Sequence, residues 1–80
     1  MNLIIKAPDY FEIIEKPMDF ASIKNKINHF KYQDYSSILD DIRLTFANCR
    51  AYNEPSSDIY KIGQRLSNYF ENQVKQLNLL

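Results

Sequence analysis

The segment AYNEPSSDIY, residues 51–60, marks the end of one helix and the start of the next. Pro55 lacks a backbone N–H and clashes with the preceding turn, so a helix arriving from the N-terminal side must end by Glu54. Ser56 or Ser57 can then cap a new helix, and the aspartate that follows suits the positive end of its dipole. The segment therefore predicts two helices joined by a very short turn.

Apolar side chains recur with helical spacing on both sides of this turn. The pattern predicts a helix from Asp19 to near His29 and a second helix that Asp34 or Ser36 can cap and that stops by Glu54. A third helix follows the turn, with apolar positions as far as Leu77. Residues 1–18 carry two prolines and are expected to form an extended loop. We expect an all-α fold in which three helices form a bundle behind this loop.

Three details refine this expectation. Gly63 lies inside an expected helix, where glycine lowers helix stability by about 1 kcal/mol relative to alanine. A glycine retained at such a position suggests close packing against another helix. The EIIE segment, residues 12–15, can form a short helical turn within the loop. The two longer helices have wider apolar faces than one short helix covers, and Leu39 and Leu44 are candidates for uncovered surface. A further element, from this protein or another molecule, would have to cover them.

Composition excludes several classes of function. The chain has 80 residues, 45% of them apolar, and ten basic residues cancel ten acidic ones. Zero net charge gives no general attraction to a phosphate backbone, so direct nucleic-acid binding is not expected. A single cysteine and the lack of a long apolar run predict a soluble intracellular domain without membrane binding.

The residue pattern does not support catalysis. His29 is the only histidine and lies at the end of a helix, where a cation suits the dipole. Cys49 falls on an apolar helix face, where a cysteine is usually a small core residue. Adjacent Asp40 and Asp41 point in different directions on a helix and cannot form a facing acid–base pair. With no phosphate loop or metal spacing, we expect no enzyme activity, metal or cofactor.

Asn53 admits two interpretations. By itself, it is most simply a helix C-cap in the left-handed conformation, which asparagine tolerates. It can also be a side-chain amide at the mouth of a helical bundle, surrounded by aromatic residues. Tyr10 and Phe11 in the loop, and Tyr52 beside Asn53, are aromatic residues suited to such a site.

Read together, APDYFEIIEKPMDFASIKNKI and FANCRAYNEPSSDIY resemble a bromodomain. The Pro-Asp-Tyr of the loop, Lys-Pro-Met-Asp, Asn-Cys, Tyr-Asn and a proline two residues beyond follow the family's order and spacing. The resemblance runs from about Ile5 to Leu77, and its specificity lies in the whole set being in register over a matching helical pattern. It implies a left-handed four-helix bundle, with helices named Z, A, B and C, that binds acetylated lysine.

The resemblance makes residues 1–80 a partial bromodomain. Helix Z and the first part of the loop between helices Z and A, which usually carries a Trp-Pro-Phe shelf, have no counterpart, and the chain has no tryptophan. We therefore expect a truncated bundle, in which a homodimer or helix exchange compensates for helix Z. The implied parts are the later part of that loop, helix A, helix B and helix C, over residues 1–18, 19–29, 35–52 and 57–77.

The resemblance also implies a binding site. Asn53 corresponds to the asparagine whose amide donates to the acetyl carbonyl, and Tyr10 to the loop tyrosine whose hydroxyl holds a bridging water. Ile59 corresponds to the gatekeeper residue beside the entrance. Further positions that the resemblance places along the pocket or its channel are Tyr52, Cys49, Phe46, Ile5 and Ala7.

These assignments imply a nuclear reader of acetylated lysine, with histone tails among its partners. An apolar pocket accepts the neutral acetyl group and rejects the ammonium of unmodified lysine, because an unpaired charge is costly to bury. The alternative is a degenerate member that acts as a helical interaction or dimerisation unit and does not bind acetyl-lysine.

Overall fold

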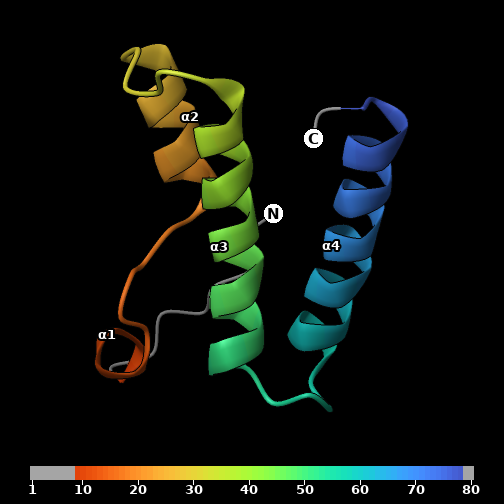
Figure 1. Ribbon diagram of the computed structural model, residues 1–80. Coiled ribbons are helices and arrows are strands. Elements are labelled where there is room, and N and C mark those ends of the chain that lie inside the picture. The colour runs from red at the N-terminus through yellow and green to blue at the C-terminus, as the bar shows by residue number, and fades with distance from the viewer. Residues whose placement is uncertain (1–8, 79–80) are drawn as a thin grey trace.

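The computed structural model describes residues 9–78, which form four helices and contain no strand. The helices are α1 (Tyr10–Ile13), α2 (Phe20–Asn28), α3 (Tyr35–Tyr52) and α4 (Asp58–Gln76). In Figure 1, α3 lies between α2 and α4, and α1 lies beside the C-terminal end of α3. The predicted all-α class is confirmed.

Side-chain caps fix where the three longer helices begin. Asp19, Asp34 and Ser57 each accept a hydrogen bond from the backbone N–H three residues on, at 2.7, 2.9 and 3.3 Å. Of the expected alternatives, Asp34 rather than Ser36 caps α3, and Ser57 rather than Ser56 caps α4. The limits of α3 coincide with the expected range, while α2 and α4 are one residue shorter at each end because the flanking residues are caps.

The helical turn in the loop lies earlier than the sequence predicts. It was expected over residues 12–15, and α1 instead begins at Tyr10. The Asp9 carbonyl accepts two hydrogen bonds from N–H groups of this turn, at 3.1 and 3.2 Å. Ile14 ends the turn because its backbone is extended and its side chain is buried.

The main core forms where α3 packs on α4. Phe46 and Cys49 are buried at its centre. The partly buried side chains that pack against them are Phe20, Ile42, Ile59, Leu66 and Phe70. The close helix contact expected at Gly63 is confirmed, since a Cβ at this position would lie 2.8 Å from the Cys49 Sγ atom.

The exposed apolar surface does not lie where the sequence predicts. The expectation is wrong for Leu39, which is only 6% exposed, and Leu44 is half-buried. Phe30 is 92% exposed, because it follows the end of α2 in a left-handed conformation with φ of 54°. Other large apolar side chains that are exposed include Ile27, Ile62, Tyr69 and Leu77.

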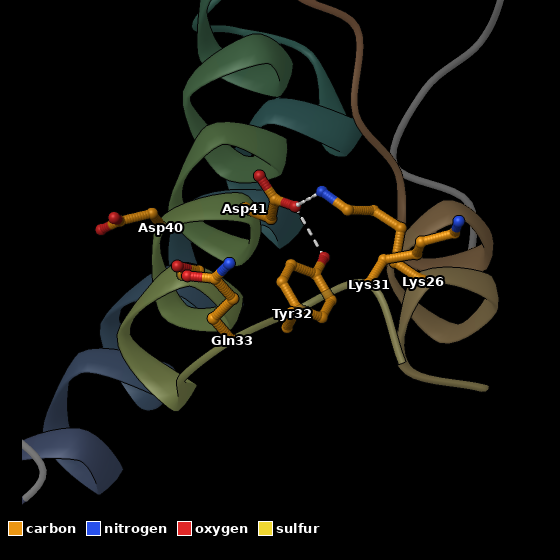
Figure 2. Close-up of a pocket in the computed structure, with 7 residues that line it drawn as sticks. Lys26, Lys31, Tyr32, Gln33, Asp40 and Asp41 are labelled. Carbon is orange, nitrogen blue, oxygen red and sulfur yellow. Dashed lines mark hydrogen bonds and ion pairs between the residues drawn. The ribbon is translucent and has the colours of Figure 1, made fainter. Parts of the chain in front are cut away.

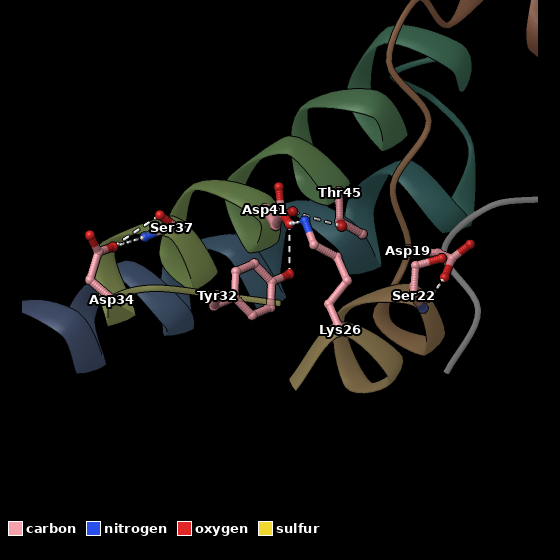
Figure 3. A network of polar contacts seen from close by, with 8 residues as sticks. All are labelled: Asp19, Ser22, Lys26, Tyr32, Asp34, Ser37, Asp41 and Thr45. Atoms are coloured by element: carbon pink, nitrogen blue, oxygen red, sulfur yellow. Dashed lines mark hydrogen bonds and ion pairs between the residues drawn. The ribbon is translucent and has the colours of Figure 1, made fainter. Parts of the chain in front are cut away.

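Two polar contacts link the helices. Arg43 of α3 donates to both carboxylate oxygens of Glu71 in α4, with Nη2–Oε1 and Nε–Oε2 distances of 2.8 and 2.9 Å. Lys26 of α2 and the Tyr32 hydroxyl both donate to Oδ2 of Asp41 in α3, at 2.6 Å each (Figure 3). These contacts hold α2 and α4 on opposite sides of α3.

Candidate functional site at the end of α3

Asn53 directly follows α3, and its backbone is extended, with φ of −96° and ψ of 146°. The interpretation of Asn53 as a left-handed C-cap is therefore wrong. Its backbone N–H and its side-chain Nδ2 both donate to the Cys49 carbonyl, at 3.1 and 3.0 Å. A carbonyl oxygen only accepts hydrogen bonds, so the nitrogen of the amide must face the helix. The same Nδ2 also donates to the Cys49 Sγ atom at 3.7 Å, and sulfur is a weak acceptor that a carbonyl oxygen can displace.

An aromatic cluster lies beside Asn53. The Tyr10 ring meets the Tyr52 ring edge-on, with centroids 5.0 Å apart, and Phe11 packs against Tyr10 in the same way at 5.2 Å. The Tyr52 hydroxyl donates to Oδ1 of Asp9 at 2.9 Å, across 43 residues of sequence. The loop that carries Tyr10 is thereby held at the end of α3 that carries Asn53.

The Tyr10 hydroxyl is buried and has no hydrogen-bond partner within residues 9–78. Burial, followed by the charge of Asp19 and by Cys49, raises the pKa of this hydroxyl, so it remains a neutral donor. A buried polar atom without a partner costs about 1–3 kcal/mol. Such an atom therefore indicates a place where a water or a ligand group binds.

The thiol of Cys49 is a core group rather than a reactive one. Cys49 is 1% exposed, and its Sγ atom lies 3.7 Å from the Ile59 carbonyl. Burial raises the pKa of this thiol, so it stays neutral and apolar near pH 7. Phe46 and Ile59 belong to the same cluster.

The structure thus brings most of the predicted site residues together. Cys49, Phe46 and Ile59 share the core between α3 and α4, and Asn53 is bonded to Cys49. Tyr10 and Tyr52 form the neighbouring aromatic cluster. Ile5 and Ala7 lie outside the described residues.

Asn48 supports the site, and its role is not predicted from the sequence. It is 7% exposed, and its Nδ2 donates to the Lys16 carbonyl at 2.8 Å, which ties the loop to α3. The available signal was a polar amide directly before the buried Cys49, on a helix face that is otherwise apolar.

A separate polar pocket of about 410 Å³ lies at the other end of α3 (Figure 2). Asp41 receives the hydrogen bonds of Lys26 and Tyr32 there, while Asp40 points away from them. Asp41 precedes Asn53 by about 18 Å of helix, at 1.5 Å per residue. This pocket is therefore distinct from the candidate site.

Within residues 9–78, no group of three or more histidine, cysteine, aspartate or glutamate side chains is arranged to hold a metal ion. Among the helices in that part of the chain, none combines the length and the apolar character needed to cross a membrane.

Comparison with known proteins decides the family. The bromodomain family model matches residues 5–65, a stretch that includes Tyr10, Asn53 and Ile59. The chain belongs to the bromodomain family. The resemblance read from the loop and helix motifs is thereby confirmed, and the bundle of α2, α3 and α4 is a bromodomain bundle.

Relatives from three kingdoms match this bromodomain over most of its length. Bromodomain adjacent to zinc finger domain protein 2B of Mus musculus is 42% identical over 64 residues, 80% of this chain and 3% of that protein. Transcription factor GTE9 of Arabidopsis thaliana is 42% identical over 69 residues, 86% of this chain and 10% of that protein. Histone acetyltransferase GCN5 of Debaryomyces hansenii is 36% identical over 67 residues, 84% of this chain and 15% of that protein. The bromodomain thus corresponds to a small part of each relative.

Proposed function

We propose that this bromodomain is an acetyl-lysine-binding reader module of a nuclear protein associated with chromatin or transcription. Family membership supports the class, because bromodomains are a reader fold that binds acetylated lysine peptides. The observation that carries the proposal for this chain is the buried Tyr10 hydroxyl, which has no hydrogen-bond partner among the described residues. It lies in the aromatic cluster that contains Tyr52, the residue directly before Asn53.

Two donors would satisfy the acetyl carbonyl. One N–H of the Asn53 amide is bound by the Cys49 carbonyl, and the other would leave the weakly accepting Cys49 Sγ atom, 3.7 Å from Nδ2, for the acetyl carbonyl. Tyr10 donates through a bridging water, and such a bridge is nearly as favourable as a direct hydrogen bond. The bond to Cys49 fixes the Asn53 amide before the ligand arrives, so less side-chain entropy is lost on binding.

Selection against unmodified lysine would come from the absence of charge around the acetyl group. Cys49 is a neutral thiol, and Phe46 and Ile59 are apolar. An ammonium placed against these side chains would lose its water, and none of the three offers a counter-charge, which is far more costly than burying a neutral amide with its hydrogen bonds made. Ile59 would pack on the methylene stem of the side chain.

Acetylated tails of histones or other basic proteins are the proposed partners. Three exposed acidic residues lie on the segments that carry Tyr10, Asn53 and Ile59, namely Glu12, Glu54 and Asp58. They would attract basic residues beside the acetylated lysine. One relative carries the word histone in its name. We propose no catalysis, cofactor, direct nucleic-acid binding or membrane binding for this chain.

The test compares an acetylated histone-tail peptide with its unmodified twin by calorimetry. We expect the acetylated peptide to bind at least about tenfold more tightly, and Asn53→Ala to remove this preference while the far-UV circular dichroism is unchanged. Asn72→Ala makes the same change at an exposed position of α4 and should bind as the wild type does. Equal binding of both peptides to the wild type would contradict the proposal.

A second candidate, a helical interaction or dimerisation unit without acetyl-lysine binding, has one observation in its favour. Phe30, Tyr69 and Leu77 are large apolar side chains that are 92%, 64% and 64% exposed. Exposed apolar surface promotes association, including homodimers and helix exchange. Sedimentation equilibrium tests this candidate: a concentration-dependent dimer that binds no acetylated peptide would favour it over the reader.

A further inference from the structure

One hydrogen bond joins the immediate neighbours of the two proposed ligand donors. The Tyr52 hydroxyl donates to Oδ1 of Asp9 at 2.9 Å. Asp9 directly precedes Tyr10, and Tyr52 directly precedes Asn53. The contact therefore ties together the two chain segments that carry the donors. On each segment, the residue that makes the contact is directly bonded to the residue that carries the donor.

The Asp9 carboxylate is committed to this contact rather than to its own helix. An aspartate before a helix usually caps it with the side chain. Asp9 makes no side-chain cap on α1, and its backbone carbonyl alone accepts hydrogen bonds from the turn, at 3.1 and 3.2 Å. The carboxylate is thereby left for the charge-assisted bond from Tyr52, a stronger class than a bond between neutral groups.

Tyr52 contacts the loop in two ways, through its hydroxyl and through its ring. The ring packs edge-on against Tyr10, with the centroids 5.0 Å apart. Ring packing alone fixes the separation of two aromatic side chains but lets one slide along the other. The bond to Asp9 prevents that sliding, because it fixes the backbone immediately before Tyr10.

The other end of the loop has its own anchor, the 2.8 Å hydrogen bond from Asn48 to the Lys16 carbonyl. Tyr10 and α1 lie between the two anchors. Loss of the Asp9 anchor would leave the α1 turn held on one side only, while the core between α3 and α4 keeps all of its contacts.

We propose that Asp9 is a positioning residue for acetyl-lysine binding: held by the Tyr52 hydroxyl, it sets the place of the Tyr10 hydroxyl relative to the Asn53 amide. The inference rests on the proposed function. Asp9 itself does not touch the ligand. It acts through Tyr10, so its effect on binding disappears when the Tyr10 hydroxyl is absent.

The experiment is a set of mutant cycles read by affinity for the acetylated peptide. Tyr52→Phe and Asp9→Ala should each weaken binding about fivefold to tenfold, the size of one hydrogen bond. The double variant should bind as weakly as either single variant, because both remove the same contact. In a Tyr10→Phe background, Tyr52→Phe should change the affinity by less than about twofold. Tyr69→Phe, the same chemical change at an exposed position of α4, should have no effect.

Hydrogen exchange on the free protein gives a readout that does not depend on the peptide. In Tyr52→Phe and in Asp9→Ala, the amides of α1 and of Ile14 should exchange faster, while those of α3 and α4 keep their wild-type rates. Global destabilisation would instead accelerate exchange in all of the helices.

Several outcomes would overturn the positioning role. It fails if Tyr52→Phe binds as the wild type does, if its effect multiplies with that of Tyr10→Phe, or if α1 exchange is unchanged. These results leave the proposed function standing, provided that the wild type still prefers the acetylated peptide. A wild-type chain that binds both peptides alike overturns the proposed function, and this role in binding falls with it.

Discussion

Gly63 of α4 faces Cys49 of α3 so closely that a Cβ atom on residue 63 would lie 2.8 Å from the Cys49 Sγ atom. The same Cys49 accepts two hydrogen bonds from Asn53 at its carbonyl, and its thiol lies 3.7 Å from the Ile59 carbonyl. The approach of the two helices therefore determines where Asn53 and Ile59 lie relative to each other. A glycine at this position allows that approach, because a Cβ there would require the Cys49 side chain or the helices to shift.

Gly63→Ala should lower the free energy of unfolding, by about 1–2 kcal/mol. Overpacking of a close contact costs about 1–3 kcal/mol, and the better helix propensity of alanine returns up to about 1 kcal/mol of this. Urea denaturation monitored by circular dichroism measures the change. Cys49→Ala removes the clashing sulfur, so Gly63→Ala should cost less in that background. A Gly63→Ala variant as stable as the wild type would show that the Cys49 side chain or the helices shift without penalty.

Asn48→Ala should destabilise the chain by about 1–3 kcal/mol, since it leaves the Lys16 carbonyl without the amide that binds it at 2.8 Å. Because the contact holds the loop, exchange of the α1 amides should rise more than that of the α4 amides. Asn72→Ala, at an exposed position of α4, is the control and should change the stability by less than about 0.5 kcal/mol. Equal stability of the two variants would show that the loop needs no such anchor.

The helices were predictable because their signals are local. Asp19, Asp34 and Ser57 stand at the starts of apolar patterns, and each caps its helix as residues of these types do. Pro55 ends α3 by a rule that needs no tertiary contact. For the same reason, the limits of the longer helices differ from the expected ranges by at most one residue at each end.

The misjudged features depend on contacts that periodicity does not encode. Leu39 looked uncovered because its partners cannot be read from one helix pattern, yet it is buried. The sequence was compatible with a left-handed backbone at Asn53. The backbone is extended instead, and the side-chain amide donates a hydrogen bond to the Cys49 carbonyl. The roles of Asp9 and Asn48 lie in hydrogen bonds across 43 and 32 residues of sequence, which the sequence alone does not reveal.

Glu71→Gln should lower the free energy of unfolding by about 0.5–1 kcal/mol at low salt and by less at 1 M salt. Arg43 binds Glu71 through two parallel hydrogen bonds, and the side chains are 32% and 44% exposed, so water screens much of the attraction. Arg43→Lys should lose most of the same energy, because an ammonium cannot reproduce the two-pronged geometry. A loss that does not change with salt would show that packing, rather than charge, carries the contact.

Acid should destabilise the fold through Asp41. Burial alone would raise the pKa of this carboxyl, but the hydrogen bonds from Lys26 and Tyr32 outweigh it and hold the pKa below its ordinary value. A carboxyl with a lowered folded pKa binds fewer protons when folded than when unfolded, so its contribution is complete above the unfolded pKa of about 4. That contribution is lost as the pH falls through the lower folded value.

Urea denaturation at several pH values between 7 and 2, at fixed ionic strength, should therefore show stability falling below about pH 4. Asp34 and Glu71 add to this slope, because the Ser37 backbone N–H and the Arg43 guanidinium hold their pKa values low. Asp41→Asn should be less stable than the wild type at pH 7 and should lose less stability on acidification. If Asp41→Asn keeps the full wild-type slope, the acid sensitivity comes from the other carboxylates and the Lys26 contact does not contribute to it.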